Sequence, residues 1–550
     1  MAASPEIVIF SARKVLTMNP ARPVTTHVAV QNGKILGSGT LEELAGWGEY
    51  TLNEQFADKV LMPGFVEGHS HTMEGMLWRH VYCGFFDRMD PNGVTWEGLK
   101  NIDSVIDRLV EEEAKLSDPA IPLTGWAIDP IYYENKSISR QHLDQVSATR
   151  PIGILHASGH ILNVNTKALE LAELFRTDIK HDGIPMGKDG YPTGELKGPD
   201  VMTPAGLHVG LNKDMLSCDE LGLRDFGRLC VRKGVTTATD LATKLDDATV
   251  ATALNTTSDP DYPARIVALR FHHGVSPSEL IEHTLELKQR STDKCRLGRI
   301  KVVADGSIQG FSARINWPGY YNGAENGLWY IAPEHLSDIY QMALRENIQV
   351  HTHTNGDEAT DLVLDTLDDA LRKHPSFDHR FTIQHGQLIS DAQFRRIAKL
   401  GCCVNLFANH HFYWGDEHYQ MTVGPERATR MNSCRSALDN SIPLAIHSDA
   451  PVTPLGPLFT AWSAVNRITS SGRTQGDHGK ISVDEALYAI TIGAAYTLNL
   501  DAEIGSIESG KRADFAVLES DPTEIDPKDL KSVEIWGTVF GGHVFSAQDL

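Results

Sequence analysis

The chain has 550 residues, and its 50 lysine and arginine residues against 72 aspartate and glutamate residues give a formal net charge of −22. This length exceeds one simple domain, and the acidic balance argues against binding to nucleic-acid backbones or anionic membranes. No apolar run approaches the roughly 18 residues of a membrane span, and the N-terminus lacks a secretory signal pattern. The seven cysteines include no CxxC pair, so no disulfide framework is indicated. We therefore expect a cytoplasmic protein with neither nucleic-acid nor membrane partners.

Both ends of the chain have the pattern of short β-strands separated by turns. The strand-like segments are residues 6–10, 28–31, 32–37, 513–518, 533–536 and 538–545. An Asn32-Gly33 pair gives a hairpin signal near the N-terminus, and glycine pairs mark turns near the C-terminus. We predict that residues 1–58 and 505–550 together build one small β-sandwich domain.

The middle of the chain alternates apolar strand segments with helical patterns. The strand segments are residues 60–66, 234–240, 265–271, 299–304, 348–353, 381–385, 402–407 and 442–449. Helical patterns separate most of them, for example at residues 333–346, 357–373 and 390–400. Eight such strands predict an α/β fold, a closed (β/α)₈ TIM barrel over residues 59–78 and 206–504. The long gap after the first strand predicts a large inserted α/β subdomain at residues 79–205.

Metal-ligating residue types stand at the ends of four of these strands. His69 and His71 end the first strand, His353 the fifth, His385 the sixth and Asp449 the eighth. In a (β/α)₈ barrel, residues at the carboxyl ends of the strands point into the active site. Side chains at positions i and i+2 share one face of a strand, so two imidazoles of the first strand point to one place. This placement predicts a divalent metal site.

Three further polar residues lie in the predicted strands, and two of them leave two readings open. His351 lies one inward layer below His353, so it is either a ligand or a histidine that supports the ligands or belongs to the core. His447 precedes Asp449 by two and is expected to face inward and support the ligands. Lys301 lies in an apolar strand, where a charged amine is costly unless it is paired. From the residues alone we favour a Lys301 paired with Asp305 or another carboxylate. The alternative is a neutral amine that reacts with carbon dioxide and bridges two metals as a carbamate.

These motifs resemble those of the metal-dependent amidohydrolase superfamily, specifically the amidohydrolase family 3 branch that includes N-substituted formamide deformylase. The matching segments cover essentially the whole chain, including residues 61–71, 158–169, 301–307, 353–357, 384–390, 448–451 and 505–515. The resemblance implies that Lys301 is a carboxylated bridging ligand, which reverses the preference above. The implied site residues are His69, His71, Lys301, His353 and His385 as metal ligands, with Asp449 beside them.

We predict a hydrolase that cleaves the non-peptide C–N bond of a small, partly apolar amide, possibly an N-substituted formamide. One or two divalent ions, Zn²⁺ by preference and two if Lys301 is carboxylated, would activate water and polarise the carbonyl. Asp449 would serve as general acid and base. His160, in the insertion, would hydrogen-bond the carbonyl, with a local helix-start contact as the alternative.

Aromatic residues near the predicted strand ends suit an apolar substituent of the substrate. Those predicted to bind it are Trp78, Phe311, Phe407 and Trp414. Packing or an oligomer interface is the alternative for each of them, and we expect a homo-oligomer, with a dimer favoured. A deaminase, lactamase or carbamate hydrolase would use similar metal chemistry. A non-catalytic barrel protein is the alternative outside enzymes, and it would have lost metal ligands.

Overall fold

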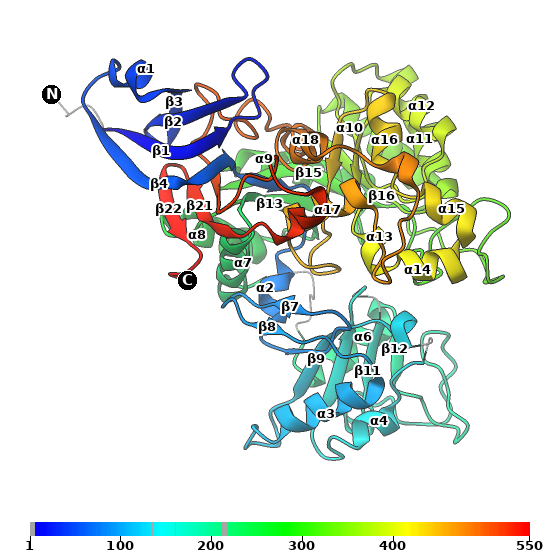
Figure 1. Cartoon of the computed structure of the whole chain (residues 1–550). Helices are drawn as coiled ribbons and strands as arrows, with labels where there is room; N and C mark the ends of the chain where they lie inside the picture. The colour runs from blue at the N-terminus through cyan, green and yellow to red at the C-terminus, as the bar shows by residue number, and fades with distance from the viewer. Residues whose placement is uncertain (1–5, 134–135, 160, 212–217) are drawn as a thin grey trace. The chain divides into compact units, whose positions relative to one another are not determined.

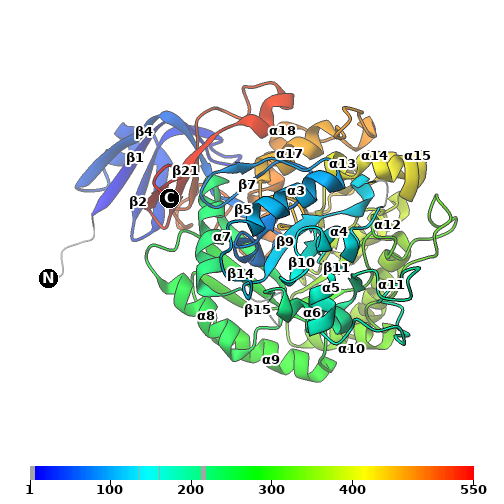
Figure 2. The same cartoon turned by 90° about the horizontal axis from the view of Figure 1, so that it is seen from below.

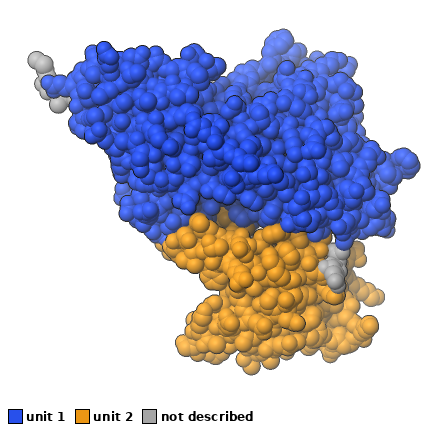
Figure 3. Space-filling model, viewed as in Figure 1, with its two compact units in different colours: residues 1–71, 227–550 blue, residues 72–226 orange. Residues whose placement is uncertain are grey.

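The computed structural model describes residues 6–133, 136–159, 161–211 and 218–550. The chain divides into two compact units, Met1–His71 with Gly227–Leu550, and Thr72–Phe226 (Figure 3). The first unit holds the strands of both chain ends and the alternating middle of the chain. It therefore contains all of the predicted metal ligands.

Eight parallel strands of the described chain form one sheet in which neighbours follow the chain order. They are β5 (Phe65–Glu67), β13 (Val235–Thr243), β14 (Arg265–Phe271), β15 (Cys295–Val303), β16 (Val350–Thr354), β17 (Thr382–His385), β18 (Cys403–Leu406) and β19 (Leu444–Ile446). Backbone hydrogen bonds join the two edges, from His71 N–H to Ala450 O at 2.7 Å and from Asp449 N–H to His69 O at 3.0 Å. The predicted α/β, TIM-barrel-like fold is confirmed in this arrangement.

Helices between the strands follow one another around the outside of the barrel, as Figure 2 shows for α8 to α12. Their bounds are α8 (Asp247–Ser258), α9 (Pro277–Gln289), α10 (Pro333–Arg345), α11 (Asp357–Lys373) and α12 (Asp391–Leu400). The last three coincide with the predicted helical segments. In α12 the side chain of Ser390 accepts the backbone N–H of Gln393, and Gly401 ends the helix with a left-handed φ of 72°.

Seven described strands from the two chain ends pair into one sheet, shown in blue and red in Figure 1. In sheet order they are β22 (His543–Ser546), β21 (Ile535–Phe540), β20 (Phe515–Leu518), β4 (Tyr50–Pro63), β1 (Ile7–Leu16), β2 (Val24–Gln31) and β3 (Lys34–Gly39). Asn32 and Gly33 take φ values of 54° and 70°, which is the type I′ hairpin geometry. The sandwich boundaries at residues 1–58 and 505–550 stay predictions.

The prediction that residues 60–66 form one barrel strand is wrong, because this apolar run contributes to two sheets. Its first part is the end of β4 in the terminal sheet, and only Phe65–Glu67 belongs to the barrel. The change of sheet occurs at Gly64, where a Cβ would lie 2.0 Å from Thr236 Oγ1. The chain passes so close to β13 here that only glycine fits without displacing a neighbour.

The unit Thr72–Phe226 has a sheet of its own, built by five of the described strands. In sheet order they are β12 (Glu195–Lys197), β11 (Ile161–Val164), β10 (Ile152–His156), β9 (Leu123–Ile128) and β6 (Val81–Tyr82). Its helices include α3 (Ile102–Glu113), α4 (Arg140–Asp144), α5 (Thr166–Leu171) and α6 (Pro199–His208). A mixed α/β unit thus lies between β5 and β13 in the chain, while the boundaries 79–205 stay a prediction.

Two properties of the whole chain bear on the sequence expectations. All seven cysteines lie buried in the described part of the chain, and no disulfide joins any two of them. In the same part, no helix combines the length and the apolar character needed to cross a membrane.

Candidate metal centre

The carboxyl ends of the barrel strands bring the predicted histidines together around Asp449. His69 Nε2 and His71 Nε2 each lie 3.4 Å from Asp449 Oδ1. His385 Nδ1 lies 3.7 Å from Asp449 Oδ2. The ring of His353 lies 4.4 Å from that of His385, measured between centroids. Four strands that are far apart in the sequence thus contribute to one cluster, which we call the histidine cluster.

Lys301 belongs to the histidine cluster and is not paired with Asp305. Its Nζ lies 3.4 Å from His69 Nε2, and burial lowers the pKa of the amine to about 7. Asp305 instead accepts hydrogen bonds at 2.9 Å from the backbone N–H groups of Arg314, Asn355 and Gly356. Of the partners considered from the residues alone, Asp305 is therefore wrong, because this carboxylate holds the loops that follow β15 and β16. The carboxylate that acts electrostatically on Lys301 is Asp449.

Two members of the cluster have a backbone conformation that is rare outside glycine. His385 has a φ of 68° and Asp449 a φ of 54°, both in the left-handed region. Such residues cost free energy and are retained where the surroundings fix them, often at functional sites. In β17 the left-handed turn breaks the simple alternation of faces, so that Gln384 and His385 both reach the cluster.

Gln384 joins two histidines by a pair of short hydrogen bonds. Its Oε1 lies 2.7 Å from His69 Nδ1, and its Nε2 lies 2.7 Å from His351 Nδ1. An amide oxygen only accepts and an amide nitrogen only donates, so His69 carries its proton on Nδ1. His69 therefore presents the lone pair of Nε2 to the cluster. Sequence reasoning gave no role to Gln384; the signal available was its position beside His385.

Glu67 is a second functional residue that sequence reasoning missed. It is buried, and its carboxylate accepts Ser448 Oγ–H at 2.8 Å, Ser448 N–H at 3.1 Å and His69 N–H at 3.3 Å. Burial raises its pKa to about 8, against the effect of these hydrogen bonds. The residue ties the end of β5 to the segment after β19, which fixes the seam of the barrel beneath His69.

The donor set of the cluster fits a divalent metal ion. Burial, together with neighbouring positive groups, holds the pKa of His69 and of His385 well below the ordinary value, so both rings are neutral. Burial alone would raise the pKa of Asp449, but the hydrogen bond from His71 and nearby positive groups leave it below its ordinary value. The buried His385 Nδ1 has no hydrogen-bond partner within the described chain. Neutral imidazoles beside an ionised carboxylate are the ligands that zinc prefers.

Two of the predicted substrate-binding aromatics, Phe407 and Trp414, lie in the same unit as the histidine cluster. The ring of Phe407 lies 5.8 Å from that of His385 and 4.7 Å from that of His447. Trp414 is only 2% exposed and packs on His410 with ring centroids 4.4 Å apart. The structure thus brings Phe407 directly to the cluster, with Trp414 behind it.

Phe311 and Trp78, two further predicted site residues, pack against other aromatic residues. Phe311 packs against Tyr320 with ring centroids 5.2 Å apart. Trp78 belongs to the unit Thr72–Phe226, where its ring lies 5.1 Å from that of Trp126. His160 lies outside the described residues. The roles of all three stay predictions.

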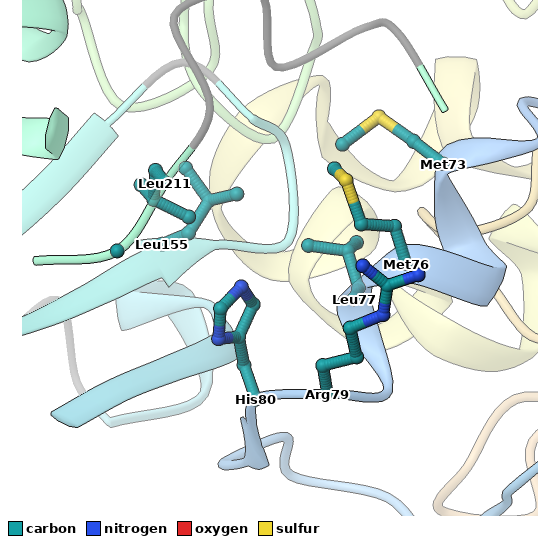
Figure 4. A pocket seen from close by; sticks show the side chains of 8 residues that line it. Met73, Met76, Leu77, Arg79, His80, Leu155 and Leu211 are labelled. Carbon is teal, nitrogen blue, oxygen red and sulfur yellow. The ribbon is translucent and has the colours of Figure 1, made fainter. Parts of the chain in front are cut away.

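A pocket of about 100 Å³ lies within the unit Thr72–Phe226 (Figure 4). Met73, Met76 and Leu77 of helix α2 (Met73–Leu77) line it together with His80. Burial lowers the pKa of His80 to about 4, so this ring is neutral at neutral pH. Its lining residues are mostly apolar and form none of the groups of the described chain that could hold a metal ion.

Comparisons with known proteins agree with the fold and the cluster. Residues 57–545 match the Amidohydrolase family. Protein LONG AFTER FAR-RED 3 of Arabidopsis thaliana is 26% identical over 96% of this chain and 89% of its own. N-substituted formamide deformylase of Arthrobacter pascens is 23% identical over 98% of this chain and 97% of its own. The crystal structure of an uncharacterized metal-dependent hydrolase from Pyrococcus horikoshii OT3 superposes with a TM-score of 0.71, at 19% identity, over 95% of this chain and 99% of that one.

The family match spans most of the chain, and the histidine cluster supplies the ligand types on which a metal-dependent hydrolase relies. The chain therefore belongs to the amidohydrolase family and is a hydrolase that acts on carbon–nitrogen bonds.

Proposed function

We propose that this chain hydrolyses the non-peptide C–N bond of a small, partly apolar amide with the help of zinc. The observation that carries the proposal is the placement of His69 and His71 at 3.4 Å from the ionised Asp449, with His385 beside them. The Arthrobacter relative acts, by its name, on N-substituted formamides. We take an N-substituted formamide as the first substrate class to test.

His69, His71, His353 and His385 would hold the metal, with Lys301 as a further ligand that makes room for two ions if it is carboxylated. Bound zinc would supply a Lewis acid for the carbonyl and a nucleophilic water at neutral pH. The amine of Lys301, with its pKa lowered to about 7, is partly neutral and can add to carbon dioxide with loss of a proton.

Asp449 carries the proton transfers in this proposal. Its lowered pKa keeps it ionised at neutral pH, so it can accept a proton from water and later deliver it to the leaving nitrogen. Phe407 lies beside His385, which supports a role in binding the apolar substituent of the substrate. We assign Trp78, Phe311 and Trp414 to the same apolar surface. We assign His160 to the substrate carbonyl. We further propose a cytoplasmic homo-oligomer, with a dimer favoured, on sequence grounds alone.

An assay of the zinc-loaded chain tests the proposal against its alternatives. We expect turnover of N-substituted formamides, its loss after chelation and its return with zinc. Asp449→Asn should lower kcat by about 10²–10⁴-fold, whereas Asp439→Asn, at an exposed helix end, should not. Lactams, carbamates, acyl-amino acids and amidines complete the panel. If only one of these other substrates were hydrolysed, that substrate class would replace N-substituted formamides in the proposal. A chain that binds no metal would overturn the proposal.

Substitution of Lys301 tests the carboxylated bridge. Lys301→Met should lose one bound ion of two and the carbamate signal in ¹³C spectra recorded with labelled bicarbonate. Lys294→Met is the matched control, since among the described residues that ammonium donates to backbone carbonyls such as Asp259 O at 2.8 Å. Full metal content in Lys301→Met would show that the bridging role is wrong.

A further inference from the structure

We propose that His447 is itself a metal ligand. It forms a group with His69 and His385, and we assign it together with His385 to a second ion position. The first position is the group made by His69, His71 and Asp449. In each group one ligand atom per residue lies within 4.8 Å of the others. This inference rests on the metal binding of the proposed function, but it adds a ligand that the strand-end pattern did not assign.

The hydrogen bonding of His447 differs from that of other buried histidines in this barrel. Both of its ring nitrogens are buried without a hydrogen-bond partner within the described chain. His410, by contrast, is bonded through Nε2 to Gln387 and through Nδ1 to His418, at 2.9 Å each. His418 in turn reaches Thr422 Oγ1 at 2.8 Å. Buried polar atoms are almost always satisfied, so the two nitrogens of His447 call for a partner that the protein does not supply.

Packing fixes the orientation of the His447 ring. It stacks on His69 at a centroid distance of 4.6 Å with an interplanar angle of 21°. Its other neighbour of this kind is Phe407, at 4.7 Å and 29°. The ring of His385 lies 5.0 Å away at 66°. The lone pair of an imidazole nitrogen lies in the ring plane, so the edge of the His447 ring is where an ion can be bound.

The seam of the barrel explains why a histidine at this position reaches the cluster. His447-Ser448-Asp449 repeats the spacing of His69-Ser70-His71, with two ligand-type residues at positions i and i+2. Hydrogen bonds from Asp449 N–H to His69 O and from His71 N–H to Ala450 O lay the two segments side by side. The seam therefore offers three imidazoles and one carboxylate from two adjacent segments.

His69 cannot serve both positions at once. Gln384 Oε1 accepts its Nδ1–H at 2.7 Å, which leaves one lone pair, on Nε2. That atom lies 3.4 Å from Asp449 Oδ1 and 3.4 Å from Lys301 Nζ. When His69 completes the first position, the second position would consist of His447, His385 and one more ligand, for which a carboxylated Lys301 is the nearest candidate. We therefore expect His447 to bind metal when both positions are filled.

Cobalt titration of the metal-free chain tests this role, with His447→Phe as the variant because it keeps a ring between His69 and Phe407. One cobalt equivalent should bind more than about tenfold more weakly, and the visible d–d spectrum should change because a nitrogen ligand is lost. His418→Gln removes a buried histidine that is bonded within the protein and should change neither. An unchanged spectrum in His447→Phe, with or without weaker binding, would overturn direct ligation.

Diffraction from crystals of the full chain at saturating zinc gives a second measurement that needs no variant. An anomalous peak about 2.0–2.1 Å from a nitrogen of His447 would support the inference. Zinc bound by the ligands of the proposed function, with no nitrogen of His447 in contact with it, would overturn the inference and leave the proposed function intact. A crystal without bound zinc would overturn both.

Discussion

The side-chain amide of Gln384 reaches two histidines, with 2.7 Å to His69 Nδ1 and 2.7 Å to His351 Nδ1. Gln384→Leu removes both hydrogen bonds and lets His69 change its tautomer or orientation. We expect zinc affinity to fall by about 10–100-fold, the usual effect of losing a partner behind a ligand. Competition with a chromophoric chelator measures this change.

Gln349→Leu provides the matched control for that experiment. Gln349 is also a buried amide of the barrel, but it donates to Arg380 O at 2.9 Å and Thr497 O at 2.8 Å. We expect this variant to lose stability while keeping its zinc affinity. Equal zinc affinity in both variants would contradict the role assigned to Gln384.

Single residues show where sequence reasoning reached the site and where it stopped. The strand-end pattern indicated His69, His71, His353, His385 and Asp449, and the structure brings these side chains together. Their partners across the barrel were not predicted, because such contacts depend on register and on local backbone conformation. The contacts of Gln384 depend on the left-handed residue that follows it, and no sequence pattern indicates that conformation.

The junction between β4 and β5 sets the start of the strand that carries the first two histidines. Gly64 occupies it, and a Cβ there would meet Thr236 Oγ1 at 2.0 Å and Thr236 Cγ2 at 2.4 Å. Gly64→Ala must push the two strands apart, which overpacks the site at a cost of about 1–3 kcal/mol in the free energy of unfolding. A lower midpoint of urea unfolding should report this loss.

Gly46→Ala is the control for that substitution. Gly46 follows helix α1 (Leu41–Ala45) with an ordinary φ of −74°, and a Cβ there meets nothing within 4 Å. Its urea midpoint should equal that of the unmodified chain or exceed it slightly. If Gly64→Ala unfolded at the same urea concentration as Gly46→Ala, the close approach of β5 to β13 would not matter for stability.

The repeated strands and helices were largely predictable because each has a clear apolar period and end signals. α11 begins and ends where its pattern indicated, with Val363, Leu364 and Leu367 buried on one face. The division of residues 60–66 between two sheets was not predictable. Both parts of that run are buried, and only the contact of Gly64 with Thr236 distinguishes them.

Hydrogen bonds between residues far apart in the sequence of the larger unit were also not predictable. The buried Arg265, at the start of β14, donates to Asp514 Oδ2 at 2.9 Å, and Asp514 O accepts Gly64 N–H at 2.9 Å. These contacts join the barrel to the sheet of the chain ends across about half of the sequence. Composition predicted an acidic chain with a large core, but it contains no information about which buried charges pair.

Buried neutral histidines make the stability of the whole metal-free chain depend on pH. Burial lowers the pKa of His156 and His272 to about 4 and that of His418 to about 3, whereas unfolded histidine titrates near 6.5. Above about pH 6.5 neither the folded nor the unfolded chain binds these protons. Below that pH the unfolded chain binds them, so the free energy of unfolding decreases as the pH drops, until the pKa of the folded state is reached. His418 alone should contribute a loss of up to about 3 kcal/mol by pH 4. Urea unfolding of chelator-treated chain at pH 7.5 and pH 5 should show a smaller loss in His418→Gln, and an equal loss would contradict this assignment.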